Sequence, residues 1–313
     1  MNIIDVHAHW APPALLEGVQ QASAADPGYA RRFQSLLGSH SAAAGDLGAL
    51  LSSMDAAGVA TALVSAPPPA GSLGPSGDAS AGRLNEQLIA AAQAHPDRLL
   101  AAIALPDGDV DRACSEVLRW SGHPLVRAVV VQTRSDDRGI DATAFLPLYR
   151  TCADAGLAVT LHPALDESSA QFREWNLHSA IGAPVSTALA AARLALSGVL
   201  DELPGLVVVL PHLGGVIPFL LARMDEQAQS GRAREPISWY ARNRFYFDTC
   251  SFQPPALRCA RESIGAGRLL LGSDFPFRGA QSRAVQDLNE HLSPEDATAI
   301  MTTNARFLLA KDR

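Results

Sequence analysis

Eight short apolar runs, separated by longer amphipathic stretches, limit how this chain can fold more than any other feature of its sequence. The runs are rich in Val, Ile, Leu and Ala, as parallel strands are when helices cover both faces of their sheet. They span residues 3–6, 61–65, 99–105, 128–132, 158–161, 206–210, 245–247 and 269–271. This alternation predicts either a (β/α)8 TIM barrel or a large doubly wound sheet.

The stretches between the runs predict the helices. They span residues 47–57, 83–94, 110–120, 145–155, 187–203, 216–229, 255–264 and 284–291. Gly58 and Gly156 follow two of these helices, at a position where glycine commonly ends a helix. Ser293 followed by Pro294 predicts the start of one more helix. No Gly-x-Gly-x-x-Gly fingerprint follows the first run, which disfavours a dinucleotide-binding sheet and leaves the barrel as the preferred fold.

We expect loop insertions after strands 1, 2 and 5 of this barrel. Residues 67–82 contain three consecutive prolines and several Gly and Ser residues, and they directly follow the second apolar run. Loops after barrel strands lie on the face that carries active sites, so this segment is expected to form a lid or rim there. No internal repeat or linker divides the chain, and residues 1–313 are expected to form one domain.

Composition excludes several classes of protein. The formal net charge is −7, so no basic surface is expected to bind nucleic acid or an anionic membrane. The four cysteines are widely spaced and contain no Cys-x-x-Cys pair. The sequence shows no signal-peptide pattern and no run of 18 apolar residues. We therefore expect a soluble cytoplasmic protein.

Residues that can bind metal stand at the ends of several predicted strands. His7 and His9 end the first strand and point to the same side, because side chains alternate along a strand. His162 ends the fifth strand, His212 follows the sixth, and Asp274 follows the eighth. The ends of barrel strands converge at one mouth, so these side chains are expected to meet.

Each of these residues also has a purely structural explanation. A single histidine such as His162 can be a core or rim residue, and an aspartate such as Asp274 can cap a helix. Four such residues at strand ends are harder to explain by structure alone. Three imidazoles and one carboxylate suit one divalent ion, with Zn²⁺ preferred and Mn²⁺, Co²⁺ or Fe²⁺ as alternatives.

The same residues lie in motifs that resemble the amidohydrolase superfamily, in the branch of aminocarboxymuconate-semialdehyde decarboxylase and aromatic-acid decarboxylases. The resemblance spans nearly the whole chain. Its motifs are IDVHAH (4–9), RLNEQL with HPDR (83–98), TLHP (160–163), SGVLDELPGLVVVLPHLGGVIPFLLARMD (197–225), YFDT (246–249), LLLGSDFPF (269–277) and NARFLL (304–309).

The resemblance implies a role for several residues. It assigns metal ligation to four residues, His7, His9, His162 and Asp274. His212 is similar to a histidine that moves a proton or orients metal-bound water, and Asp274 shares in the catalysis. The resemblance also implies a homodimer.

Substrate contacts are expected from four further positions. Arg223 matches an arginine that binds the substrate carboxylate, often across a dimer interface; the alternative is a charge on a helix surface. Asp248 is expected near the metal or at a helix cap. Trp10 and Phe277 are expected to form walls of the pocket for a small carboxylate substrate.

The sequence departs from the family pattern in two places. Residues 36–55 contain no arginine, although the decarboxylase that acts on aminocarboxymuconate semialdehyde binds a carboxylate with one there, and His40 is a weak substitute. Binuclear relatives bridge two metals with a carbamylated lysine on the fourth strand. The only lysine of this chain is Lys311, so the site is expected to be mononuclear.

Three functions fit this pattern. The preferred one is a metal-dependent decarboxylase of a small aromatic or enoic carboxylic acid. The first alternative is a hydrolase in which metal-activated water attacks a lactone, amide or ester. The second is a metal-binding barrel without catalytic activity, against which the complete ligand set argues.

Overall fold

Eight parallel strands form one sheet in the computed structural model, which describes residues 2–25, 41–67, 77–135, 138–164, 172, 174–229, 231–250 and 254–309. The strand order is β1-β2-β3-β4-β7-β8-β9-β10. Their bounds are β1 (Ile3–His9), β2 (Val59–Ser65), β3 (Leu99–Ala104), β4 (Val126–Gln132), β7 (Ala158–His162), β8 (Val208–Leu210), β9 (Phe245–Asp248) and β10 (Leu269–Leu270). A short antiparallel pair, β5 (Arg134–Ser135) and β6 (Arg138–Gly139), lies outside this sheet.

Backbone hydrogen bonds between β1 and the segment after β10 close the sheet into a ring. The amide of Val6 donates to Leu271 (2.8 Å), the amide of Asp274 to His7 (2.7 Å) and the amide of His9 to Phe275 (2.8 Å). The predicted TIM barrel is therefore confirmed, and its last bonds are made beside the residues expected to bind metal.

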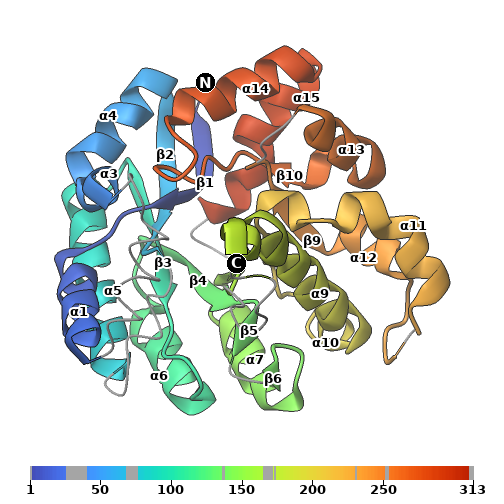
Figure 1. Cartoon of the computed structure of the whole chain (residues 1–313), viewed down its shortest axis with the longest axis horizontal. Helices are drawn as coiled ribbons and strands as arrows, with labels where there is room; N and C mark the ends of the chain where they lie inside the picture. Colours follow the sequence, from blue (N-terminus) through green and yellow to red (C-terminus); the bar gives the residue numbers. More distant parts are fainter. Residues whose placement is uncertain are drawn as a thin grey trace.

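Helices surround the ring (Figure 1). Their bounds are α1 (Pro13–Ala25), α3 (Ser41–Gly45), α4 (Leu47–Ala57), α5 (Gly77–Ala94), α6 (Val110–Trp120), α7 (Leu146–Asp154), α9 (Ala183–Leu196), α10 (Val199–Glu202), α11 (Ile217–Gln227), α12 (Ile237–Asn243), α13 (Pro254–Ile264), α14 (Gln281–His291) and α15 (Pro294–Thr298). Gly58 ends α4 with φ 67°, and Ser293 caps α15 by accepting from the Asp296 amide, both as predicted.

Several predicted boundaries were wrong. The single helix expected over residues 187–203 is two helices, because the backbone turns at Gly198, where φ is 81°. Residues 77–82, expected in a loop, form the first turns of α5. The rest of the expected lid, residues 68–76, lies outside the described part of the chain, as does His40. Helices α1, α3 and α12 were not predicted.

The strands bury side chains on both faces. Inside the ring lie small and branched residues, among them Ile4, Val6, Leu63 and Ala102. The opposite faces pack against the helices in a larger core. Because the interior is filled, a ligand at the mouth can reach only the last residues of each strand.

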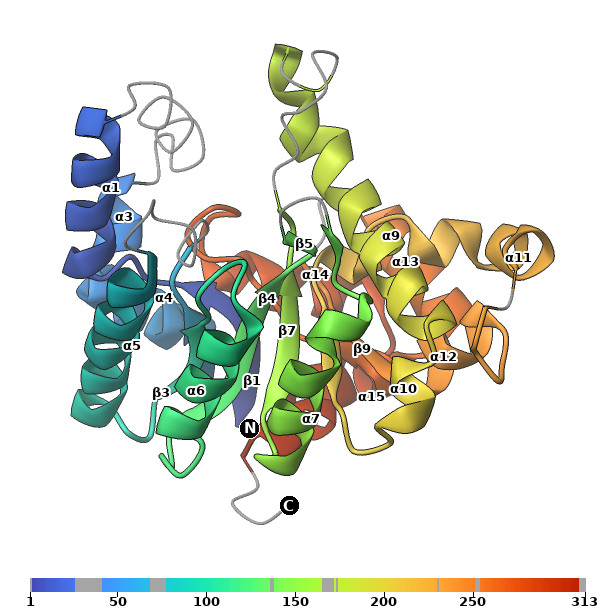
Figure 2. The same ribbon diagram turned by 90° about the horizontal axis from the view of Figure 1, so that it is seen from below.

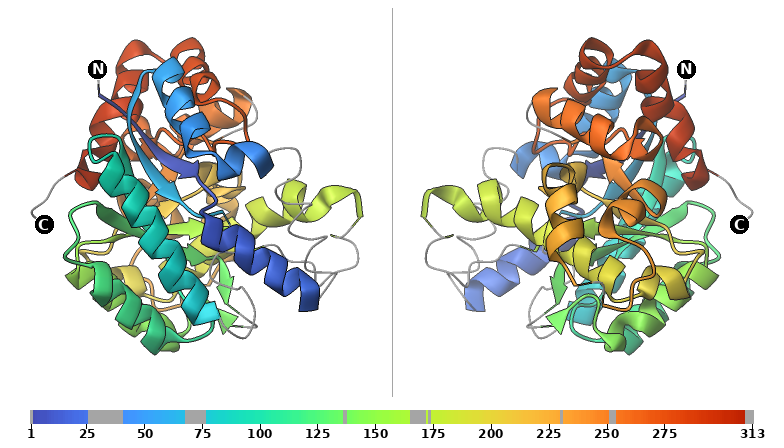
Figure 3. Two further views of the ribbon diagram at one scale, coloured as in Figure 1. Left: turned by 90° about the vertical axis from the view of Figure 1, so that its left-hand side faces the viewer. Right: turned by 90° about the vertical axis from the view of Figure 1, so that its right-hand side faces the viewer.

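Helices α1 and α9 project beyond the mouth, while the start of β1 lies at the opposite end of the barrel (Figure 2). Side views show the same projection (Figure 3). The stretch Glu174–Leu196, which includes α9, is long and apolar enough to span a membrane by length and composition. Of the apolar 18-residue window within it, 44% is buried within the fold, as expected for a helix that packs on a protein core.

Candidate metal centre

The residues predicted as ligands meet at the mouth of the barrel. His7 and His9 lie at the end of β1 and His162 at the end of β7. The Nε2 atoms of His7 and His9 are 3.0 Å apart, and the rings of His7 and His9 lie 6.0 Å and 5.4 Å from that of His162. One ring nitrogen from each of the three lies within 4.8 Å of the others, a spacing that allows all three to bind one ion.

Asp274 completes this group from the loop after β10. Its Oδ1 lies 3.2 Å from His9 Nε2 and 3.6 Å from His7 Nε2. Its backbone is left-handed, with φ 55°, and its amide is bonded to the carbonyl of His7. The closing bonds of the barrel therefore direct this carboxylate toward the imidazoles.

His212 belongs to the same cluster. Its Nε2 lies 3.4 Å from Asp274 Oδ2, and His7, His212 and Asp274 form a second set of donors within 4.8 Å of one another. Gly214 makes this turn possible, because a Cβ there would lie 2.7 Å from the ring of Phe247. The geometry thus allows His212 to bind the ion or to exchange a proton with Asp274.

Buried hydrogen bonds fix the orientation of the imidazoles. Asp248 Oδ2 lies 2.7 Å from His7 Nδ1, and its Oδ1 accepts from the backbone amides of His212 (2.9 Å) and Cys250 (3.0 Å). Ser65 Oγ lies 3.0 Å from His9 Nδ1. In each case the bond at Nδ1 leaves Nε2 facing the cluster, as in metal sites where outer partners orient the ligands.

Electrostatics favour a cation at this point. Burial lowers the pKa of His9 and holds that of His162 well below its usual value, so both rings are neutral donors. Burial alone would lower the pKa of His7, but Asp248 and Asp274 raise it to about 9. Burial would raise the pKa of Asp274, yet the charge of His7 and hydrogen bonds from His212 hold it well below its usual range. A divalent ion would take the place of the proton on His7.

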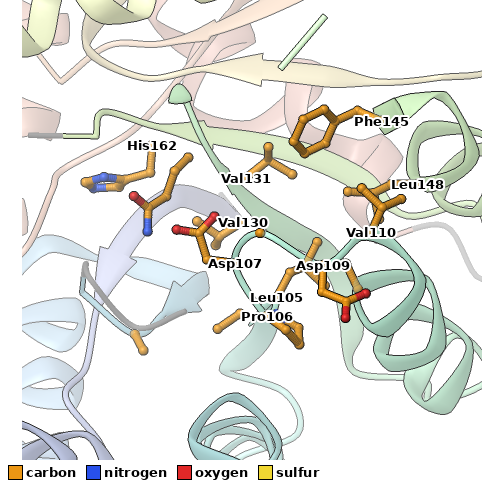
Figure 4. A pocket seen from close by; sticks show the side chains of 15 residues that line it. Leu105, Pro106, Asp107, Asp109, Val110, Val130, Val131, Phe145, Leu148 and His162 are labelled. Carbon is orange, nitrogen blue, oxygen red and sulfur yellow. The ribbon is translucent and has the colours of Figure 1, made fainter. Parts of the chain in front are cut away.

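A cavity opens beside His162 between the ends of β3 and β4 (Figure 4). Its walls are mainly apolar, with Val130 and Leu105 among them. Asp107 turns its carboxylate toward the side on which His162 lies, whereas Asp109 points away (Figure 4). Asp109 caps α6 by accepting from the amide of Arg112.

The structure places the remaining predicted residues as follows. The ring of Phe277 packs edge-on to His9 at 5.4 Å, beside the cluster. Trp10 is buried and its indole donates to the carbonyl of Gly45 (3.3 Å). Asp248 is fully buried and bonded to protein groups, so it orients His7 from behind. Arg223 is exposed on α11 in the outer layer of helices.

Two residues of the site were missed by the sequence analysis. Ser65 holds His9, and Cys250 lies with its Sγ 3.9 Å from Asp274 Oδ2. Both follow the rule used for the histidines, since Ser65 ends β2 and Cys250 lies two residues beyond β9. A search for every polar residue at a strand end would have found Ser65.

The fold and the site together define a barrel enzyme that binds a divalent metal ion through histidine and aspartate. The amidohydrolase family model matches residues 4–310, so this chain belongs to the amidohydrolase family.

Three relatives illustrate the similarity. Gamma-resorcylate decarboxylase from Rhizobium sp. strain MTP-10005 is 29% identical over 83% of this chain and 85% of its own. The crystal structure of 2,6-dihydroxybenzoate decarboxylase from Rhizobium is 26% identical, with a TM-score of 0.85 over 99% of this chain and 98% of that one. A dihydroxybenzoic acid decarboxylase from Polaromonas sp. JS666, solved with manganese and 2-nitroresorcinol, has the same fold at 23% identity, with a TM-score of 0.81 over 99% and 97% of the two chains.

Proposed function

We infer that this chain is a metal-dependent decarboxylase of a small aromatic carboxylic acid. The observation that carries this inference is the cluster of three imidazoles, one carboxylate and an adjacent His212 at the mouth of the barrel. The similarity to Rhizobium decarboxylases over most of the chain supports decarboxylation rather than hydrolysis. We propose a hydroxybenzoate as the substrate class.

His7, His9, His162 and Asp274 would hold a divalent ion, which would act as a Lewis acid and stabilise negative charge on the substrate. A proton can pass between His212 and Asp274, because His212 Nε2 and Asp274 Oδ2 lie 3.4 Å apart. They deliver a proton to the ring carbon that bears the carboxylate, using an electron pair of the ring. The bond to the carboxylate then breaks, its electron pair restores the aromatic ring, and CO₂ leaves.

The identity of the ion is a separate proposal. Three imidazoles and one carboxylate suit Zn²⁺, and Mn²⁺ is the alternative that a solved relative of the same fold contains. Elemental analysis of the purified protein distinguishes them. We expect one ion per chain, because Lys311 is the only lysine in the chain and none is available to bridge a second ion from the fourth strand.

We further propose that the chain acts as a homodimer in the cytoplasm and that Arg223 binds the carboxylate of a substrate held by the partner copy. The exposure of Arg223 on α11 supports this role. Replacing Arg223 by alanine would then raise KM about 10-fold or more, as expected for loss of a charged hydrogen bond. An unchanged KM would mean that Arg223 is a surface residue that does not bind the substrate.

The central experiment compares two reactions of one protein preparation. We expect CO₂ release from 2,6-dihydroxybenzoate after Zn²⁺ or Mn²⁺ is added to metal-depleted protein, and no hydrolysis of dihydrocoumarin, a lactone. Lactone hydrolysis without CO₂ release would favour the hydrolase. One ion bound per chain with neither reaction, across several hydroxybenzoates, would favour a barrel without catalytic activity.

A further inference from the structure

A second cavity lies at the opposite end of the barrel from the metal centre. Its volume is about 520 Å³, within the range of small-molecule sites. Its lining residues stand where β4, β7, β8 and β9 begin, among them Val126, Leu157 and Val207. Arg127, at the start of β4, and Gln132, which pairs with His162, are separated by roughly 16 Å at the usual rise of a strand. This cavity is therefore separate from the active site.

Arg127 gives this cavity a positive group. Its Nε is buried and has no hydrogen-bond partner among the described residues. Its Nη1 makes only a long contact, 3.4 Å, with the carbonyl of Val126. Burial lowers the pKa of Arg127, and in the described part of the chain no carboxylate acts to raise it. A guanidinium that is partly removed from water normally has an anion beside it.

The other walls of the cavity favour a planar ligand. The ring of Tyr246 stacks on Phe307, with centroids 4.7 Å apart and an interplanar angle of 30°. The guanidinium of Arg268 lies 5.0 Å from the centre of the Tyr246 ring and adds positive charge on this side. Among the described lining residues the only acidic side chain is that of Asp154, which is exposed at the end of α7 and therefore screened by water.

We propose that this cavity is a binding site for a small aromatic carboxylate, distinct from the catalytic site. Arg127 binds the carboxylate through its forked N–H groups, and the ring of the ligand packs against Tyr246, Phe307 and the valines of the strand ends. A planar carboxylate fits because it places its charge on the guanidinium and its apolar edge on the aromatic wall. The metal-site residues do not line this cavity. A ligand bound here would therefore change the stability or the conformation of the barrel and would not take part in the reaction.

The test uses 4-fluorobenzoate as the probe and fluorine NMR titration of the full-length protein, with and without bound metal. We expect metal-depleted protein to bind 4-fluorobenzoate at one site per chain. Arg127→Met should weaken that binding about 10- to 100-fold, the effect of losing a charged hydrogen bond. The matched control is Arg258→Met, an exposed arginine on α13, which should bind like the unmodified protein.

Three outcomes would overturn the proposal. The first is that metal-depleted protein does not bind 4-fluorobenzoate, and the second is that Arg127→Met binds it as well as the unmodified protein does. The third is that inorganic phosphate displaces 4-fluorobenzoate at a concentration lower than the one at which 4-fluorobenzoate itself binds. If Arg127→Met fails to fold, Arg127→Lys retains the charge but loses the fork and should bind the probe about 10-fold more weakly. Because binding is measured without turnover, the result is independent of whether the chain is a decarboxylase.

Discussion

At the scale of single residues, we assign the binding of the ion and the movement of a proton to different histidines. His162 offers a neutral ring, since burial holds its pKa well below the usual value. His212 differs because its imidazole Nε2 lies 3.4 Å from a carboxylate oxygen of Asp274. The two histidines occupy similar places in the sequence, since His162 is the last residue of a buried strand and His212 lies two residues beyond another, yet we assign them different tasks.

Replacing each of these histidines by alanine tests that division. We expect His162→Ala to lose both bound metal and CO₂ release, because one of the imidazole ligands is removed. His212→Ala should keep one metal ion per chain and lose turnover by about 100-fold or more, as for loss of a general acid. Metal content by elemental analysis, beside CO₂ release, gives the answer. Equal loss of metal in the two variants would show that His212 is a ligand.

At the scale of elements, one buried carboxylate joins three parts of the chain. Asp5 of β1 accepts hydrogen bonds from the Ser273 hydroxyl (2.6 Å), the Ser273 amide (3.1 Å) and the side-chain amide of Gln281 (2.6 Å). It also accepts from the amide of His7 (3.1 Å). These bonds connect β1, the loop after β10 and α14, and thereby position the loop that carries the metal-site aspartate.

We predict that Asp5→Asn lowers the free energy of unfolding by about 2–3 kcal/mol. The side-chain NH₂ group of the asparagine would face N–H and O–H donors, and these donors would lose the charged oxygen that accepts their hydrogen bonds. Urea unfolding of metal-depleted protein measures this change without a contribution from metal binding. Asp46→Asn is the matched control, since Asp46 is an exposed helix cap and asparagine caps equally well. Similar stability of both variants would mean that water replaces the lost acceptor.

The sequence predicted an element well where its apolar residues repeat at regular intervals. Helices α4 and α6 were predicted residue for residue, because their apolar positions repeat clearly and a glycine or a change of pattern ends them. The metal cluster was predicted because strand ends converge in any barrel. Asp248 and Ser65 could not be assigned to His7 and His9, since those pairs depend on rotamers and on contacts between residues far apart in the chain.

At the scale of the whole molecule, the projecting helix α9 has an uncovered apolar face. Ile181, Val185 and Leu189 are four residues apart, so they lie on one side of the helical stretch, and they are 43–58% exposed. Phe219 on α11 is 83% exposed. Apolar side chains grouped like the three of the α9 stripe commonly mark a contact between proteins. This surface supports the proposed homodimer.

If α9 forms the dimer contact, an aspartate in its apolar stripe should separate the subunits. We expect Leu189→Asp to raise the dimer dissociation constant about 30-fold or more, as for loss of a central contact residue. Analytical ultracentrifugation measures the association. Leu118→Asp is the control, because Leu118 is equally exposed on α6 but lies apart from the stripe. A monomer at all concentrations of the unmodified protein would contradict the proposed assembly.

The closing bonds between β1 and residues 271–275 also decide when in its synthesis the protein can capture metal. His7 and His9 are translated early, whereas Asp274 follows His9 by 265 residues. A nascent chain that ends before residue 271 has neither the carboxylate nor the strand edge that positions the two histidines. Stable metal binding therefore has to wait until residue 274 has been translated, and we expect a chain truncated before that residue to bind no metal at this site.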